Sequence, residues 1–410
     1  MSPKDSPTFC SLGWNHQFIG TGGLVKPCCR YAGKHVPDTH NLRDHTLEEV
    51  FNDEFMTNLR ESFTYGDRDP GCMKCWQEED AGKRLSIRQN YNRNIIPLNE
   101  LHHDMDTSDP TIRWLELSFN NRCNVRCRMC GPNFSTNWYK DWELVKEYVP
   151  TPYDFQRNVD NVEDYIRINP EPKTIDLSKL DSILPNIRHL KLTGGEPFIM
   201  PEYRMILERL VEIGQAKNVF LNYSTNLTIM PKQSDLDLWK HFKYIEFATS
   251  LDGIGDVLEY QRFPSKWDTV QKVLKSLFDL RKDMNVKVGT RPTITVYNIL
   301  DVPNITHYWS ELEGGLTEES WINHTHCALP DFLSITILPE HLKKLVKERL
   351  DNTDAITKRQ RQSWNHLVAY MYSKDDSHLL PEFKDFTLKL DQARGEDMAK
   401  VIPEFAELVK

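Results

Sequence analysis

Three cysteines follow one another at short intervals directly after a strand-like apolar run. The run covers residues 114–119, and the cysteines are Cys123, Cys127 and Cys130, in a C-x3-C-x2-C pattern. Three thiolates can hold three corners of a cubane iron-sulfur cluster and leave its fourth iron open, whereas a cluster that only carries electrons is normally held by four cysteines. The spacing therefore favours a cluster whose open iron binds another molecule. A zinc site or three buried thiols would also explain these residues.

Length and cysteine usage narrow the class of protein. At 410 residues the chain exceeds the usual single core, so we expect a main domain of about two hundred residues plus smaller parts. No run of about eighteen apolar residues occurs, and residues 1–7 contain no apolar signal core, so we expect a cytoplasmic protein without a membrane segment. Its nine cysteines are then better explained as metal ligands than as disulfides, because cytosolic reductants keep thiols free.

The charge balance argues against a broad nucleic-acid surface. Lys and Arg number 51 against 60 Asp and Glu, which gives a formal charge of −9. A nucleic-acid partner is therefore not indicated, although a local basic groove is compatible with this total.

Composition and periodicity divide the chain into three parts. Residues 1–100 are rich in turn-forming residues, hold five cysteines and include a helical pattern over 46–60, so we expect a small metal-bound domain there. The polar stretch 102–110 is typical of a linker. Residues 111–330 alternate short apolar runs with helical segments, which predicts β/α units around a parallel sheet. Residues 331–410 are charged and helical, for example over 341–350 and 360–372, and are expected to form a C-terminal cap.

Six strands are predicted between residues 111 and 330, which suits a partial (β/α)6 TIM-like barrel better than an eight-stranded one. The predicted strands are 112–118, 187–192, 219–224, 244–249, 286–296 and 321–325.

Polar side chains follow several of these strands, where functional groups converge in a parallel barrel. A glycine turn, helix caps and a solvated arginine would explain the same residues without a ligand. The residues concerned are Gly194, Gly195 and Glu196 after the second strand, Ser224 and Asn226 at the third, Ser250, Asp252 and Arg262 after the fourth, and Asn298 near the fifth.

The three cysteines followed one strand later by Gly-Gly-Glu resemble the radical S-adenosylmethionine (radical SAM) superfamily. The resemblance implies that Cys123, Cys127 and Cys130 bind a catalytic 4Fe-4S cluster whose open iron is chelated by SAM. Electron transfer from the reduced cluster would then release a 5′-deoxyadenosyl radical. The family usually has an aromatic residue where this chain has Met129, and methionine can also pack over adenine.

The same resemblance assigns the residues after the strands to SAM. It places Gly194, Gly195 and Glu196 against the methionyl amino group and pairs Arg262 with the carboxylate. The apolar backbone of residues 293–298 would flank adenine, with Asn298 at its end facing the site as a cofactor candidate, and Tyr297 is interpreted as a packing residue. Side chains expected to line the ribose and carboxylate side are Ser224, Asn226, Ser250 and Asp252.

The N-terminal part carries a second motif, G-x-V-x-P-C over residues 23–28, which resembles the SPASM and twitch auxiliary-cluster domains of radical SAM enzymes. It implies a second 4Fe-4S cluster held by Cys10, Cys28, Cys72 and Cys75. Four cysteines with a C-x2-C pair also suit tetrahedral zinc, so that alternative stays open. A further signature of such domains places Glu79, Gly82, Ser86 and Arg88 after the last cysteine. Here the auxiliary domain precedes the barrel, whereas it usually follows.

Several residues have no assignment. Cys29 and Cys327 could donate a hydrogen atom near substrate or could be inert buried thiols. His324 and His326 alternate along the predicted sixth strand and would face one side, as zinc or substrate groups or as structural histidines. Segment 386–396, with Asp391, Arg394 and Glu396, and the pair at 403–404 also resemble the family.

The resemblance implies an enzyme that abstracts a hydrogen atom from substrate and needs a flavodoxin- or ferredoxin-type reductant. A saturated auxiliary cluster would transfer electrons, which favours oxidation or cross-linking of a peptide or protein, as in maturases that carry such domains. The alternative enzyme class acts on a small molecule, namely a nucleotide, a carbohydrate or a cofactor precursor. A zinc-bound interaction module is the non-enzymatic alternative.

Overall fold

The computed structural model describes residues 3–80, 86–93, 106–132, 134–148, 176–312, 320–327, 329–354 and 357–410. Two predicted features lie partly or wholly outside these residues: Gly82 of the auxiliary-domain signature, and the first part of the linker at 102–110. Within the described residues, none of the helices has the length and apolar character needed to cross a membrane.

Ten strands are described. They are β1 His16–Ile19, β2 Val25–Lys26, β3 Trp114–Leu117, β4 His189–Leu192, β5 Phe220–Thr225, β6 Tyr244–Thr249, β7 Val286–Thr290, β8 Thr293–Ile294, β9 Ser320–Ile322 and β10 Thr325–His326.

The described α-helices divide into a group before β3 and a longer group after it. The first group is α1 Leu12–Asn15, α2 Leu47–Phe51, α3 Glu54–Tyr65, α4 Met73–Asp80 and α5 Ile87–Arg93. The second group is α7 Tyr139–Val145, α9 Pro201–Glu212, α10 Gln233–Trp239, α11 Asp256–Gln261, α12 Trp267–Asp279, α13 Val302–Glu311, α14 Glu340–Asn352, α15 Lys358–Met371, α16 Leu380–Arg394 and α17 Met398–Val401.

One eight-stranded sheet has the strand order β2-β1-β3-β4-β5-β6-β7-β9, and a two-stranded sheet pairs β10 with β8. Six neighbours in the large sheet, from β3 to β9, are the predicted strands in chain order, so the α/β partial-barrel prediction is confirmed. The strand predicted over 286–296 is interrupted: β7 ends at Thr290 and β8 begins at Thr293. The break contains Pro292, which has no N–H to give to a neighbouring strand.

Two strands from the N-terminal part extend the sheet edge, which the sequence did not predict. β1 pairs with β3 in parallel, with His16 opposite Trp114 and Ile19 opposite Leu117. β2 then pairs with β1 antiparallel. β1 and β2 are too short to show a clear period of two, so the cysteine-rich composition dominated the prediction for this part of the chain.

The chain divides into two compact units. Unit 1 comprises Met1–Asn121, Thr151–Asn222 and Gln233–Ile245, and unit 2 comprises Arg122–Pro150, Tyr223–Lys232 and Glu246–Lys410. Each unit is described below by itself.

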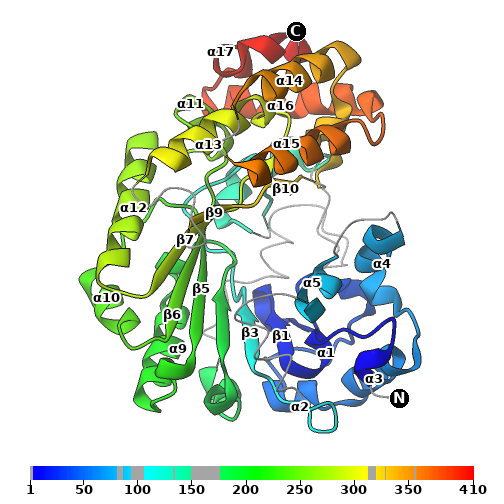
Figure 1. The fold of residues 1–410 in the computed structure, drawn as a ribbon, viewed down its shortest axis with the longest axis vertical. Coiled ribbons are helices and arrows are strands. Elements are labelled where there is room, and N and C mark those ends of the chain that lie inside the picture. The colour runs from blue at the N-terminus through cyan, green and yellow to red at the C-terminus, as the bar shows by residue number, and fades with distance from the viewer. Residues whose placement is uncertain are drawn as a thin grey trace. The chain divides into compact units, whose positions relative to one another are not determined.

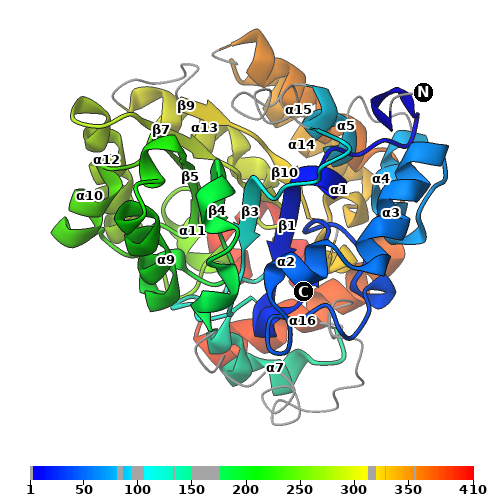
Figure 2. The ribbon, with the colours of Figure 1, turned by 90° about the horizontal axis from the view of Figure 1, so that it is seen from below.

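In unit 1, β3 and β4 present an apolar face to helices. Successive side chains of a strand point to opposite faces, so Leu115 and Leu117 share a face with Leu190 and Leu192 of the parallel neighbour. All four are fully buried, and the Tyr203 hydroxyl of α9 donates a hydrogen bond of 2.9 Å to the Leu117 carbonyl oxygen. Figure 2 shows β1, β3 and β4 in this order.

The opposite face of the same strands is polar and aromatic. Trp114 stacks on His189 at 5.1 Å between ring centroids, and His16 meets Trp114 edge-on at 4.3 Å. Glu116 accepts a 2.6 Å hydrogen bond from Lys191 Nζ and is buried. Unit 1 therefore carries a charged pair on the sheet face away from the leucines.

The helical pattern predicted over 46–60 forms two helices rather than one. Thr46 and Glu49 make a reciprocal capping box at the start of α2. Asp53 then caps α3 by accepting from the Met56 backbone N–H, and α3 ends at Gly66, whose φ of 89° suits glycine. A capping residue such as Asp53 can start a new helix within a continuous apolar pattern, because its side chain accepts from an N–H group that has no partner in the first turn of that helix.

Unit 2 contains the C-terminal helices, which confirm the helical prediction for this part of the chain. Figure 1 shows α14 to α17, in orange and red, gathered as one group. α12 is a typical covering helix: Val270, Val273, Leu274 and Leu277 are buried at helical spacing, and the helix contacts β7.

Candidate functional site

The three cysteines of the motif lie together in one loop of unit 2. Cys123 and Cys127 are 8% and 3% exposed, and they pack with Val125, Met129 and the partly buried Cys130. The motif thus forms a compact turn with its sulfur atoms gathered in one region.

Side chains just after the motif hold its backbone. Asn137 Nδ2 donates to the Cys123 carbonyl oxygen at 2.7 Å, and Trp138 Nε1 donates to the Cys127 carbonyl oxygen at 2.9 Å. Ser135 Oγ donates to the Val125 carbonyl oxygen. A loop has no regular backbone hydrogen bonds, so these side-chain donors satisfy its carbonyl oxygens instead. The residues that follow the motif therefore fix the backbone that carries the thiols.

Hydrogen-bond donors point at the sulfur atoms of Cys127 and Cys123. A hydrogen bond with Cys130 lowers the pKa of Cys127 to about 7, and the Arg262 guanidinium contributes in the same direction. Arg262 NH1 donates to Cys127 Sγ at 3.5 Å, and Asn226 Nδ2 donates to Cys123 Sγ at 3.7 Å. Cationic and amide donors aimed at sulfur stabilise thiolate ligands and tune the potential of a cluster.

Asp252 and Arg262 form a buried ion pair beside this loop. Arg262 Nε and NH2 both lie 2.6 Å from Asp252 Oδ2, and the Asp252 side chain is fully buried. The Thr293 backbone N–H donates to Asp252 Oδ1 at 2.7 Å. The guanidinium thus bridges a buried carboxylate and a cysteine sulfur.

Asn298 contacts the loop that holds Asp252, and it does so through backbone groups. Its Nδ2 donates to the carbonyl oxygens of Asp252 and Thr293 at 2.8 and 2.9 Å, and its Oδ1 accepts from the Thr295 N–H. In this arrangement Asn298 joins the loop after β6 to β8. Tyr297, interpreted as a packing residue, is buried and contacts the rings of Tyr260 and Phe383.

Asn226 lies on a tight turn directly after β5. Its Oδ1 accepts from the Thr228 N–H at 2.9 Å, and Leu227 between them has a φ of 64°. A non-glycine residue in the left-handed region costs roughly 1–2 kcal/mol and often marks a functional turn. Ser224 and Ser250 are partly exposed, and the Ser250 N–H donates to the Thr225 carbonyl oxygen at 3.0 Å.

The Gly-Gly-Glu motif lies in unit 1, directly after β4. Gly194 has a φ of 105°, and a Cβ atom there would lie 2.9 Å from the Asn120 carbonyl oxygen. The Gly195 N–H donates to the same oxygen at 3.3 Å, and Glu196 is fully buried. Only glycine permits this close approach to the residues that lead from β3 into the cysteine motif.

The other four predicted cysteine ligands lie in unit 1 and influence one another. The thiols of Cys28 and Cys72 both interact electrostatically with those of Cys10 and Cys75. Burial is the largest cause that raises the pKa of Cys10 and Cys28 to about 12, and it also raises that of Cys72 and Cys75. Since metal ligands must be thiolates, binding a metal centre at these thiols would release protons.

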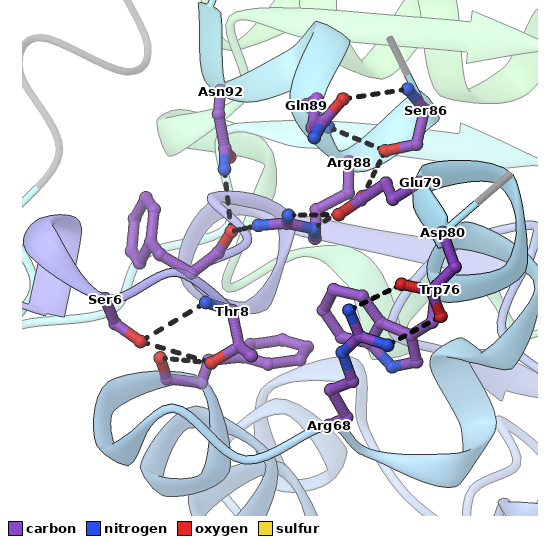
Figure 3. A network of polar contacts seen from close by, with 12 residues as sticks. Ser6, Thr8, Arg68, Trp76, Glu79, Asp80, Ser86, Arg88, Gln89 and Asn92 are labelled. Atoms are coloured by element: carbon purple, nitrogen blue, oxygen red, sulfur yellow. Dashed lines mark hydrogen bonds and ion pairs between the residues drawn. The ribbon is translucent and has the colours of Figure 1, made fainter. Parts of the chain in front are cut away.

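The Glu79, Ser86 and Arg88 signature contacts the backbone of the residue before Cys10. Arg88 pairs with Glu79 through two hydrogen bonds of 3.0 and 2.6 Å, and Ser86 Oγ donates to the same carboxylate. Arg88 NH1 and Asn92 Nδ2 both donate to the carbonyl oxygen of Phe9, at 2.6 and 2.7 Å. Figure 3 shows Arg88 between Glu79 and Asn92. The signature therefore ties the segment after Cys75 to the residue before Cys10.

The two thiol sets fit iron-sulfur centres by the chemistry of their surroundings. In unit 2, an arginine and an amide point at two of the three motif sulfurs, and in unit 1 the Cys72 thiol interacts electrostatically with those of Cys10, Cys28 and Cys75. Among the described residues, no three His, Cys, Asp or Glu side chains come close enough to hold a single metal ion.

The remaining predicted candidates have mostly structural surroundings. Cys327 is 3% exposed, and its thiol donates to the Leu329 carbonyl oxygen at 3.4 Å. His324 bonds Ser363 through Nδ1 at 2.7 Å, and His326 stacks on Tyr370 at 4.0 Å. Cys29 is exposed, and its thiol interacts electrostatically with Glu116.

Sequence reasoning missed two groups of charged residues. Glu116 and Lys191 form the ion pair on the polar face of β3 and β4. Each is a charged residue within a short apolar strand, and this pattern could have indicated a buried charge. Arg126 and Arg128 flank Cys127. Arg126 pairs with Asp141, 15 positions away, and Arg128 pairs with Asp391, 263 positions away, and neither separation gives a local pattern that could identify the pair.

Comparisons with known proteins agree with the two sites. Residues 117–307 match the family model of the radical SAM superfamily, and residues 10–76 match that of the SPASM iron-sulfur cluster-binding domain. No curated protein matches the chain.

Proposed function

We propose that this chain, which belongs to the radical SAM superfamily and carries a SPASM iron-sulfur domain, oxidises or cross-links a peptide or protein substrate. It is an enzyme with a 4Fe-4S cluster, SAM and auxiliary iron-sulfur centres as cofactors, and it needs a reductant. The observation that carries the proposal is the gathering of Cys123, Cys127 and Cys130 with Arg262 and Asn226 at their sulfurs.

Each residue has a proposed part in this chemistry. When bound, the catalytic cluster and SAM supply a radical that removes a hydrogen atom from substrate, and the auxiliary cluster supplies an electron acceptor. Cys123, Cys127 and Cys130 would hold the first cluster, and Cys10, Cys28, Cys72 and Cys75 the second. Residues proposed to contact SAM are Gly194, Gly195, Glu196, Ser224, Asn226, Ser250, Asp252, Arg262 and Asn298.

Within this set, the contacts support different roles. Arg262 already pairs with Asp252, so it would present its outer N–H groups to an incoming carboxylate while its charge stays compensated. Asn298 holds the backbone of Asp252 and Thr293, so we infer that it positions the loop. Buried side chains that are already hydrogen-bonded need no reorganisation when a ligand binds.

Anaerobic reconstitution followed by reduction in the presence of SAM tests the proposal. We expect formation of 5′-deoxyadenosine, its loss in Cys127→Ala, and its retention in Cys327→Ala, which removes a buried thiol outside the motif. Absence of 5′-deoxyadenosine from the loaded wild-type protein would exclude radical SAM activity. Full auxiliary iron in Cys10→Ala or Cys28→Ala would exclude the proposed ligand set.

The substrate class rests on the SPASM domain, which accompanies peptide-maturing members of the superfamily. Peptides encoded by the neighbouring genes are the probes to incubate with the loaded enzyme, and mass spectrometry should show the loss of two hydrogen atoms from a peptide substrate. A small charged substrate is the second candidate, because Glu116 and Lys191 provide both charges on one sheet face. A cytoplasmic location belongs to the same proposal, because cytosolic reductants keep cysteine ligands available for metal, and a flavodoxin or ferredoxin would be the reductant there.

A further inference from the structure

Two arginines flank Cys127, and both are joined to the C-terminal segment of unit 2. Arg128 is fully buried although it lies in the middle of the cysteine motif. A buried arginine requires anionic or aromatic partners, because its charge cannot be removed at ordinary pH.

The partners of Arg128 come from the end of the chain. Its NH2 lies 2.5 Å from Asp391 Oδ1 and 2.7 Å from Glu396 Oε2, while its guanidinium lies 3.6 Å from the ring centroid of Tyr260. The Tyr260 hydroxyl donates to the same Asp391 oxygen at 2.8 Å. Asp391 belongs to α16, and Glu396 follows Gly395, where the chain turns in the left-handed conformation.

Arg126 reaches the same segment through one intermediate. Its NH1 donates to Asp141 Oδ1 of α7 at 2.6 Å. Arg394 of α16 donates to Asp141 Oδ2 through Nε at 2.9 Å and places its guanidinium 5.4 Å from the ring centroid of Trp138. Trp138 is the side chain that holds the Cys127 carbonyl oxygen. Two chains of contacts therefore connect the ends of the Cys127 turn to α16.

The same turn is paired with the segment that carries Arg262. The N–H groups of Arg126 and Arg128 donate to the carbonyl oxygens of Phe263 and Gln261, at 2.7 and 2.8 Å. Arg128 Nε also donates to the Tyr260 carbonyl oxygen at 3.1 Å. A shift of Arg128 would therefore move both the Cys127 turn and the backbone on either side of Arg262.

We propose that Asp391 and Glu396, acting through Arg128, position Cys127 and Arg262 for SAM, so that the C-terminal segment is a working part of the catalytic site. The inference rests on the proposed function of Cys127 and Arg262. Arg128, Asp391 and Glu396 are positioning residues, since none of them contacts a sulfur atom. The three cations Arg126, Arg128 and Arg394 are matched by the three anions Asp141, Asp391 and Glu396, so removing one member leaves a buried charge without compensation.

A double-mutant cycle between Arg128→Gln and Glu396→Gln tests this role in the loaded full-length protein. SAM affinity and the change that SAM causes in the EPR signal of the reduced cluster are measured together with iron content. We expect each single variant to bind SAM about tenfold more weakly, and the double variant to lose no more than the Arg128→Gln variant. Two unrelated structural defects would instead multiply to about a hundredfold.

Glu404→Gln is the matched control, because Glu404 lies in the same C-terminal segment with a side chain 41% exposed and should leave SAM binding unchanged. If Arg128→Gln fails to fold, Asp391→Asn and Glu396→Gln each test the role alone. Wild-type affinity and a wild-type EPR change in both of these variants would overturn it. A wild-type protein whose EPR signal does not respond to SAM would instead exclude the proposed function.

Discussion

A single arginine determines much of the charge around Cys127. Arg262 is 8% exposed, bridges Asp252 and Cys127 Sγ, and follows the α11 helix that ends at Gln261. A planar guanidinium can serve a carboxylate and a sulfur at once, because its N–H groups point in several fixed directions. An ammonium group on a flexible stem cannot hold both partners in the same geometry.

Arg262→Lys should therefore retain the fold and the iron but lose function. The remaining cation can still compensate Asp252, so the buried carboxylate is not left unpaired, which would cost about 3–5 kcal/mol. We expect the rate of 5′-deoxyadenosine formation to fall about tenfold or more, since a positioned donor is lost. Arg209→Lys, on the exposed side of α9, is the control. A wild-type rate in Arg262→Lys would show that the guanidinium geometry is unimportant.

Single residues also show where local sequence was informative. The motif cysteines, Asn226, Asp252 and Arg262 were predicted as candidates from their places after strands, and the structure brings these unit 2 residues together. Arg128 was not predicted, because Asp391 lies 263 positions away along the chain. A contact at that separation follows from packing of the whole unit, and no periodicity or spacing encodes it.

At the scale of elements, one ion pair joins α4 and α5 of the auxiliary domain. Arg88 of α5 pairs with Glu79 of α4, and both side chains are nearly buried, at 8% and 11% exposure. The same guanidinium lies 4.8 Å from the Trp76 ring centroid and holds the residue before Cys10. The pair thus joins the helix that bears Cys75 to the segment that bears Cys10.

Arg88→Ala should lower the auxiliary iron content while leaving SAM cleavage measurable. Without Arg88 the Phe9 carbonyl oxygen loses one of its two side-chain donors, and the Glu79 carboxylate is left nearly buried without its cation. Arg68→Ala is a close control, because Arg68 also lies over Trp76 and pairs with Asp80, but both side chains are more than half exposed. Iron and sulfide analysis of both variants checks the expectation. Equal iron in the two would show that the signature does not position Cys10.

Element boundaries show a similar division between what was predictable and what was not. β6 was predicted with its observed bounds, because strand-forming residues run from Tyr244 to Thr249 with Glu246 as the one charged residue among them. β1 and β2 were missed since each covers at most four residues: β1 pairs with β3, a partner nearly a hundred positions away, and β2 pairs with β1. Short strands are specified by their neighbours in the sheet more than by their own composition.

For the whole molecule, one buried carboxylate links stability to pH. Asp301, at the start of α13, accepts from the Ile254 N–H and from Asn304 Nδ2, both at 2.6 Å. Burial raises the pKa of Asp301 to about 6. Because this folded-state pKa lies above that of an unfolded aspartate, the folded chain binds the proton more tightly. The stabilisation is complete below about pH 4 and is lost as the pH rises through 6.

Asp301→Asn should remove this pH dependence. Between pH 5 and 7.5 the wild type should lose about 1 kcal/mol of unfolding free energy from this group, and the neutral amide should lose none. The melting temperature of Asp301→Asn relative to that of the wild type should therefore rise by about 1–2 °C over this range. Asp256→Asn, which changes an exposed carboxylate at the start of α11, should show no such trend. A constant difference between Asp301→Asn and the wild type would mean that Asp301 is ionised throughout, with its two hydrogen bonds sufficient to stabilise the buried charge.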